Sequence, residues 1–223
     1  MEADPAHGYY LVLLAVLLFG AAGTLRWPEA WIYLALTALM SIGAGLWLAR
    51  VDPGLLTERL GSAIQRGQKL WDKVFMILVS TAWISWFVLM GLDAVRYRWS
   101  DVPVWIQVAG FVLICLGCYL VGLTFKANTY AAPVIKIQSD RAHRVVSTGP
   151  YAYVRHPMYA GALLLILGVP LMLGSWLGLA TSAVLIAMLA ARAVFEEETL
   201  KAELDGYADY ARRVRYRLVP LVW

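Results

Sequence analysis

The residues best suited to chemistry lie in one short stretch, Arg155-His156-Pro157-Met158-Tyr159, where a long apolar run begins. Proline favours the first turn of a helix, because its missing N–H would have no partner there in any case. The unpaired backbone N–H groups of that turn would point toward Arg155 and His156 and attract an anion such as a carboxylate. The stretch therefore predicts a binding site at the surface of a membrane.

A second group of polar residues, Glu196-Glu197-Glu198, ends the apolar run that follows. Gly174 and Ser175 leave only a tight turn between the two runs, which predicts an antiparallel helical hairpin. Because a helix rises about 1.5 Å per residue, folding the chain at Gly174 places His156 roughly level with Arg192 and the three acids about one turn beyond it. Glu196 could also pair with Arg192, four residues earlier, and be structural. The basic and acidic groups are thus expected at one end of the hairpin.

A pocket made of a helix N-terminus, a histidine, tyrosines, acids and arginines suits a ligand that carries both charges. In an amino-acid-bearing sulfonium nucleotide, the carboxylate would face arginine, the ammonium a glutamate, and the sulfonium or adenine the tyrosine rings. A nicotinamide dinucleotide, a phospholipid headgroup or a structural charge network would satisfy the same groups, although the sequence has no Rossmann glycine fingerprint. The residues alone leave these alternatives open.

Membrane-spanning helices must position these groups, since 61% of the 223 residues are hydrophobic, only 15% are charged and the mean hydropathy is +0.65. Six apolar runs approach the roughly 20 residues that cross a bilayer: 9–23, 28–49, 74–92, 103–125, 157–173 and 175–195. We expect an all-α, polytopic transmembrane helical bundle of five or six spans, with a C-terminal helical hairpin and a cytoplasmic cofactor pocket. Residues 1–125 would form a scaffold of about four spans, and residues 126–223 the catalytic and cofactor-binding region.

Basic residues gather on the connections after the second, fourth and sixth runs, whereas only Arg26, Arg96 and Arg98 lie on the other side. The positive-inside rule therefore predicts that both termini are cytoplasmic. Orientation and anionic lipid headgroups explain the net charge of +4 better than nucleic acid does. Cys115 and Cys118 lie inside an apolar run with no charged neighbour, so we expect them to pack in the bundle and expect no metal site.

Two segments resemble the signature of bacterial relatives of isoprenylcysteine carboxyl methyltransferase: residues 137–151 and residues 154–161. The tail is similar to that family as well, in Glu196-Glu197-Glu198-Thr199-Leu200, Gly206-Tyr207, Tyr210 and residues 213–220. A weaker match covers Asp52-Pro53-Gly54-Leu55-Leu56 with Glu58-Arg59-Leu60, and Trp71-Asp72-Lys73. The R-H-P-x-Y and E-E combination also occurs in phospholipid N-methylating enzymes, so it indicates the class but not the substrate. Lys136, Ala142 and Ala152 depart from the bacterial pattern, and the missing arginine at Ala152 could alter substrate contacts.

The resemblance implies S-adenosylmethionine as cofactor and an integral protein of a bacterial inner membrane. The methyl group would go to a lipophilic acceptor, such as an isoprenylcysteine-type carboxylate of a prenylated molecule or a lipid. A carboxylate acceptor needs no general base, whereas an amine would need one, for which His156 or His143 would be available. The alternatives are an NADPH-dependent membrane reductase of the sterol-reductase type and a non-enzymatic membrane scaffold.

The same resemblance assigns roles to individual residues, with Glu197 as the preferred contact of the cofactor ammonium or ribose. The expected catalytic residues are Arg155 and His156; the cofactor-binding residues are Tyr151, His156, Tyr159, Glu197, Glu198, Gln138 and His143; the substrate-binding residues are Tyr207, Tyr210, Arg213 and Arg217.

Overall fold

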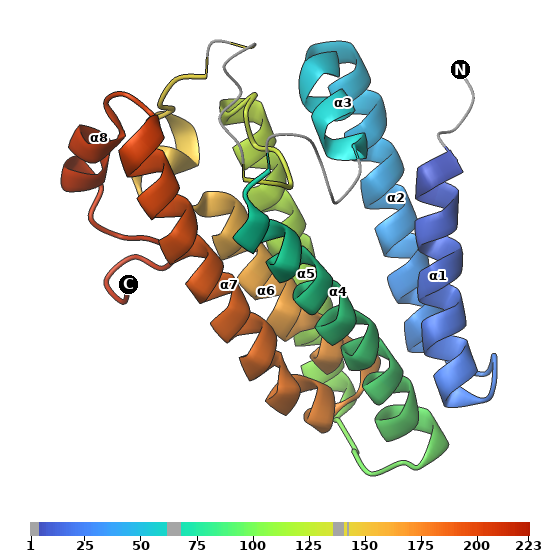
Figure 1. The fold of residues 1–223 in the computed structure, drawn as a ribbon. Helices are drawn as coiled ribbons and strands as arrows, with labels where there is room; N and C mark the ends of the chain where they lie inside the picture. The colour runs from blue at the N-terminus through green and yellow to red at the C-terminus, as the bar shows by residue number, and fades with distance from the viewer. Residues whose placement is uncertain (1–4, 62–67, 136–140, 142) are drawn as a thin grey trace.

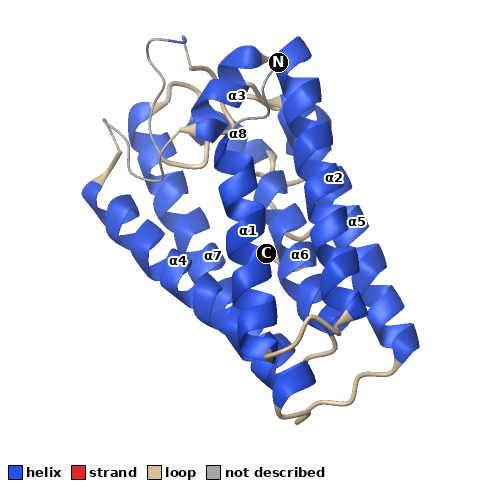
Figure 2. Ribbon diagram, turned by 90° about the vertical axis from the view of Figure 1, so that its right-hand side faces the viewer, coloured by secondary structure: helices blue, strands red, loops and turns tan. Residues whose placement is uncertain are grey.

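The protein is a bundle of helices whose long members run roughly along one direction (Figure 1). The computed structural model describes residues 5–61, 68–135, 141 and 143–223, and this part of the chain contains no strand (Figure 2). The α-helices are α1 (Pro5–Ala22), α2 (Pro28–Val51), α3 (Pro53–Leu60), α4 (Leu70–Gly91), α5 (Val104–Ala127), α6 (Pro157–Leu173), α7 (Trp176–Glu203) and α8 (Tyr207–Arg213). A π-helical turn, η1 (Leu92–Arg96), continues α4, and a 3-10 turn, η3 (Gly149–Ala152), precedes α6. The expected all-α architecture is confirmed.

Among the residues that the structure describes, four segments are long and apolar enough to cross a membrane: α2, α4 with η1, α5 and α7. Two shorter apolar helices, Tyr9–Ala22 within α1 and Pro157–Leu173, complete the set. These six helices correspond to the six apolar runs of the sequence. The helix α7 continues past the end of its apolar run to Glu203, so its acidic residues lie on a helical extension rather than in a loop.

The predicted C-terminal hairpin is formed by α6 and α7. Gly174 ends α6 with φ +81°, in the left-handed region where glycine has no steric penalty. Ser175 then caps α7, its hydroxyl accepting a hydrogen bond from the N–H of Gly178. This turn lies at one end of the bundle, while α3, α8 and the connection from α5 to α6 lie at the other (Figure 1). The described residues of the polar segments that carry the sequence signature therefore gather at that second end.

Glycines let α5 and α6 approach each other closely, which fixes the helix that carries the signature. A Cβ placed on Gly117 would lie 2.8 Å from the carbonyl oxygen of Gly161, and one on Gly110 would lie 2.7 Å from that of Gly168. Small residues at such crossings allow direct backbone contact between helices in a membrane. The start of α6 is thus held at a defined depth against the end of α5.

Candidate functional site

The site is built around the first turn of α6. Pro157 occupies the first helical position and His156 is the residue before it, as the sequence predicts. The backbone N–H groups of Arg155 and His156 donate to the carbonyl oxygens of Tyr216 and Arg217, each at 2.9 Å. The C-terminal tail is therefore bound directly to the R-H-P stretch.

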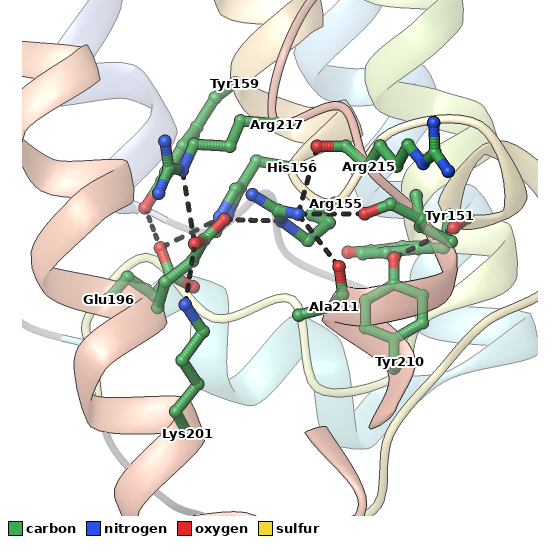
Figure 3. A network of polar contacts seen from close by, with 12 residues as sticks. Tyr151, Arg155, His156, Tyr159, Glu196, Lys201, Tyr210, Ala211, Arg215 and Arg217 are labelled. Atoms are coloured by element: carbon green, nitrogen blue, oxygen red, sulfur yellow. Dashed lines mark hydrogen bonds and ion pairs between the residues drawn. The ribbon is translucent and has the colours of Figure 1, made fainter. Parts of the chain in front are cut away.

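Glu197 is a buried carboxylate that contacts four basic side chains, Arg155, His156, Lys201 and Arg217, which Figure 3 labels. Its Oε1 accepts from Arg155 Nε at 2.6 Å and lies 3.3 Å from His156 Nε2. Its Oε2 lies 3.2 Å from Arg217 Nε and 3.5 Å from Lys201 Nζ. A charge this deeply buried is stable only when it is paired in this way. Glu197 therefore joins α6, α7 and the tail.

The guanidinium group of Arg155 donates hydrogen bonds from two of its nitrogens. Its Nη1 donates to three carbonyl oxygens around the end of α8, those of Ala211, Val214 and Arg215, at 3.2, 2.9 and 3.1 Å. A cation at a helix C-terminus is favoured by the exposed carbonyl groups there. Arg155 thus couples α8 to Glu197, and its catalytic role stays a prediction.

His156 lies between two glutamates. Its Nε2 faces Glu197, and its Nδ1 lies 3.9 Å from Glu196 Oε2. The ring of Tyr159 stacks on the imidazole with a centroid distance of 5.4 Å and an interplanar angle of 6°. The Tyr159 hydroxyl donates to the same Glu196 oxygen at 2.5 Å. His156 and Tyr159, predicted to face the same side of the helix start, are therefore joined by stacking and by their shared contact with Glu196.

A cavity opens beside this unit. It is lined by His156, Tyr159 and Glu196, by tyrosines from η3 and α8, and by the connection after α5. Its inner space is about 90 Å³, and the unfilled space including the open mouth is about 790 Å³. Small-molecule pockets usually measure roughly 300–1,000 Å³, so a nucleoside can enter only if the walls move apart.

Three of the tyrosines that line the cavity differ in how their hydroxyls are used. Tyr151 accepts from Asn128 Nδ2 at 2.8 Å, and Tyr210 donates to the Tyr151 carbonyl at 2.8 Å. Tyr207 is buried, yet its hydroxyl has no hydrogen-bond partner within the described part of the chain. Burial and the nearby charges of Glu197 and Glu196 raise the pKa of Tyr207, so its hydroxyl stays protonated. This group is available to a ligand.

His143 lines the same cavity from the connection after α5, and its ring packs against Tyr130 with a centroid distance of 4.4 Å. Burial lowers its pKa, and the positive charge of Arg141 lowers it further, against a smaller opposite effect of Glu196. His143 is therefore neutral at physiological pH. The other cofactor residue expected in this connection, Gln138, lies outside the described residues.

The remaining predicted residues lie away from the cavity. Glu198 and Arg213 are exposed, and neither lines it. Glu197 does not line it either, because its carboxylate points into the basic cluster, whereas Glu196 does line it. Arg217 is bound to Glu197 and lies over the ring of Trp223 at 5.0 Å.

A second buried ion pair was not predicted from the sequence. Arg192 Nη2 lies 3.1 Å from Asp72 Oδ1 and donates to the carbonyl of Pro133 at 2.7 Å, while Asp72 Oδ2 accepts from the N–H of Ile135 at 3.1 Å. Arg192 is therefore paired with Asp72 rather than with Glu196, and the pair holds the chain that forms one wall of the cavity. An arginine within an apolar run is costly without a partner, and that signal could have revealed the pair.

The comparisons with known proteins find similarity to membrane methyltransferases. A family model described as phospholipid methyltransferase matches residues 105–204. The protein-S-isoprenylcysteine O-methyltransferase of Schizosaccharomyces pombe is 32% identical over 111 residues, which cover 48% of this chain and 47% of that protein. Protein-S-isoprenylcysteine O-methyltransferase B of Arabidopsis thaliana is 33% identical over 113 residues, covering 49% and 57%. The resemblance to isoprenylcysteine carboxyl methyltransferase is confirmed.

The fold agrees with this result. The structure of the eukaryotic intramembrane Ras methyltransferase ICMT superposes with a TM-score of 0.59 over 97% of this chain and 75% of that one, at 20% identity. The cobalt-zinc-cadmium resistance protein CzcN of Cupriavidus metallidurans is also similar, 30% identical over 128 residues, which cover 57% of this chain and 56% of that protein. The matches with the isoprenylcysteine methyltransferases and CzcN span about half the length of those relatives. The chain is thus an integral membrane protein with the fold of the isoprenylcysteine methyltransferase.

Proposed function

We propose that the protein transfers a methyl group from S-adenosylmethionine to a lipophilic acceptor at the membrane surface. The observation that carries this proposal is the position of His156, Tyr159 and Glu196 together on the wall of one cavity, at the end of the bundle where α6 begins. The similarity to protein-S-isoprenylcysteine O-methyltransferases supports the type of reaction.

The donor set around the cavity suits a dipolar nucleoside. Glu196 offers a carboxylate that is partly exposed, and both of its contacts within the described residues use Oε2, which leaves Oε1 for a ligand hydroxyl or ammonium. Tyr207 offers a buried, protonated hydroxyl, and the faces of Tyr151 and Tyr210 offer stacking surfaces. Glu197 and Arg155 act indirectly in this proposal, by fixing His156 and the tail.

The residues carry out the reaction by positioning and by excluding water. When bound, S-adenosylmethionine supplies a methyl carbon on a positively charged sulfur. A carboxylate oxygen of the acceptor forms the new C–O bond with its own electron pair, while the electron pair of the broken C–S bond stays on sulfur, so no proton moves. His156 and Tyr159 would hold the reacting groups in line. The buried tyrosines would keep the site dry, which makes the carboxylate more reactive than it is in water.

The orientation follows from the distribution of charge. The polar end of the bundle carries α3, α8 and most of the lysine and arginine residues, whereas Arg26, Arg96 and Arg98 belong to the other end. We therefore place the cavity and both termini at the cytoplasmic face of a bacterial inner membrane. The cofactor would then enter from water and the acceptor from the bilayer.

An isotope experiment tests this function. Membranes containing the protein are incubated with S-adenosylmethionine that carries a labelled methyl group, and lipids and small molecules are examined by mass spectrometry. We expect a labelled lipophilic ester that is absent with a His156→Ala, Glu196→Gln double variant and present with the exposed control Glu198→Gln. A labelled product formed equally by the double variant would contradict the proposal, and so would the absence of any labelled product.

A further inference from the structure

One motif of the sequence is not used by the cavity described so far. This motif, residues 52–60, contains α3 (Pro53–Leu60), a short helix that lies at the end of α2 (Figure 1). Asp52 caps it by accepting from the N–H of Leu55 at 2.9 Å, Pro53 occupies its first turn, and Leu55 is fully buried. Capping and burial fix the rotation of the helix. This rotation directs Arg59, one turn after Leu55, toward the bundle.

Arg59 reaches the border of the cavity. Its guanidinium group lies over the ring of Phe125 at 4.2 Å. Its Nη1 donates to the carbonyl of Ala131 at 2.8 Å and lies 3.7 Å from the sulfur of Met158. Ala131 and Met158 both line the cavity that also contains His156. Arg59 therefore stands next to the proposed methyl-transfer site, on the side opposite α7 and α8.

No carboxylate pairs with Arg59 anywhere in the described ranges, and its Nε and Nη2 have no hydrogen-bond acceptor there. Burial lowers its pKa to about 10, so the group is still charged at physiological pH but has lost much of its contact with water. A cation in this position is costly unless an anion joins it. The other half-buried arginines near the cavity, Arg155 and Arg192, each have a glutamate or aspartate partner.

An apolar groove leads from the membrane side to Arg59. Residues of α2 and α5 form its walls, and it measures about 580 Å³. Its walls include Leu39, Met40, Trp47, Tyr119 and Leu123, and its polar end carries Arg59 and Lys126. Arg59 also lines a second cavity, of about 430 Å³, between α1, α2 and α3. A hydrocarbon chain ended by an anion matches this pattern of walls and charge.

We infer that Arg59 binds the anionic group of the lipophilic methyl acceptor, whose hydrocarbon chain lies in the groove between α2 and α5. This inference rests on the proposed function. An anion at Arg59 would be in contact with the residues that separate the groove from the cavity, Ala131 and Met158. A lipid of the surrounding bilayer has no need to place its anionic group next to the cavity, whereas a methyl acceptor does. Arg59 would therefore select acceptors with a carboxylate over acceptors with an amine.

The test uses a probe that needs no turnover. The protein is placed in nanodiscs of zwitterionic lipid and titrated with doxyl-labelled stearic acid or its methyl ester, at a pH where the acid is ionised. Quenching of Trp47, which lines the groove, reports occupancy, and a Trp47→Phe variant identifies its share of the signal. We expect the wild-type protein to bind the acid roughly tenfold more tightly than the ester, as for a hydrogen-bonded charge pair.

Matched variants assign this preference to Arg59. Arg59→Gln is expected to bind acid and ester about equally, Arg59→Lys to keep part of the preference, and Arg50→Gln, an exposed change in the last turn of α2, to keep all of it. Methyl transfer to N-acetyl-S-farnesylcysteine should show a raised KM in Arg59→Gln with a smaller change in kcat. Unchanged binding of S-adenosylhomocysteine by this variant would show that it is folded. If Arg59→Gln does not fold, the comparison of acid and ester binding by the wild-type protein and by Arg59→Lys still tests the role of Arg59.

Equal binding of acid and ester by the wild-type protein would overturn the inference, as would a preference that persists in Arg59→Gln. Displacement of the acid by added phosphatidylglycerol, at the same affinity, would show a headgroup site and also overturn it. Binding of S-adenosylhomocysteine without any acid preference would refute the role of Arg59 alone. An acid preference without cofactor binding would instead refute the proposed function.

Discussion

Two tyrosines on α8 should have opposite effects on the stability of the protein when each is replaced by phenylalanine. Tyr207 is 4% exposed and its hydroxyl has no partner in the part of the chain that the structure describes, whereas Tyr210 is 1% exposed and donates to the carbonyl of Tyr151. A buried polar group without a hydrogen bond costs ~1–3 kcal/mol. Tyr207→Phe removes this cost, so it should increase the free energy of unfolding by about 1 kcal/mol. Tyr210→Phe loses a hydrogen bond and should decrease it by about the same amount.

For a chain of this size, such a change moves the midpoint of thermal unfolding by about 2–4 °C per kcal/mol. The assay is thermal unfolding of the purified proteins in one detergent, followed by titration with S-adenosylhomocysteine. If the Tyr207 hydroxyl binds the ligand, Tyr207→Phe should weaken binding by roughly twofold to twelvefold, the value of one hydrogen bond. The variant should therefore be more stable and bind less well.

A change far from the site controls for the loss of a hydroxyl as such. Tyr97→Phe alters an exposed residue at the other end of the bundle and should leave the unfolding midpoint and the affinity unchanged. The reasoning is refuted if Tyr207→Phe lowers the midpoint as much as Tyr210→Phe does. It is also refuted if the affinity for S-adenosylhomocysteine stays the same.

Three further outcomes follow from the packing and the charges. Glu197→Gln should lower the free energy of unfolding by ~3–5 kcal/mol, because it leaves buried cations without their carboxylate. Chemical denaturation measures this change. In the same assay the exposed control Glu198→Gln should change the free energy by no more than about 0.5 kcal/mol. Gly117→Ala should cost ~1–3 kcal/mol by forcing α5 and α6 apart, whereas Gly20→Ala, which meets no atom within 4 Å, should be tolerated in the same assay. The pKa of His143 is lowered in the folded protein, so below about pH 6.5 the unfolded chain binds more protons than the folded one. The protein therefore loses stability as the pH falls through this range. The midpoint of thermal unfolding should fall less over the same range in His143→Gln.

The position of the site was predictable because it follows from counting residues along two helices. Folding the chain at Gly174 predicted the R-H-P stretch and the acidic residues at one end of the hairpin, within about one helical turn of each other, and the structure places His156 Nε2 3.3 Å from Glu197 Oε1. Proline at the first helical position and the six apolar runs were also local signals, and the structure reproduces both. Patterns within one or two helices were therefore sufficient for the architecture.

The direction in which each of the three glutamates points could not be predicted in this way. Adjacent residues of a helix point about 100° apart, so Glu196 faces the cavity, Glu197 faces the basic cluster and Glu198 is exposed. Which of them faces the ligand depends on the rotation of α7, and residues far along the chain fix that rotation. Among these is Asp72, which pairs with Arg192 from the start of α4. Side chains that depend on such long-range contacts cannot be assigned from spacing alone.

The central claim is that the cavity beside His156 binds an adenosyl cofactor. Isothermal titration of the purified protein with S-adenosylhomocysteine and, separately, with NADPH tests it most directly. The account predicts one-site binding of S-adenosylhomocysteine, weakened in Glu196→Gln and in Tyr207→Phe but not in Glu198→Gln, and no binding of NADPH. Binding of NADPH by protein that ignores S-adenosylhomocysteine would contradict the account and favour a reductase.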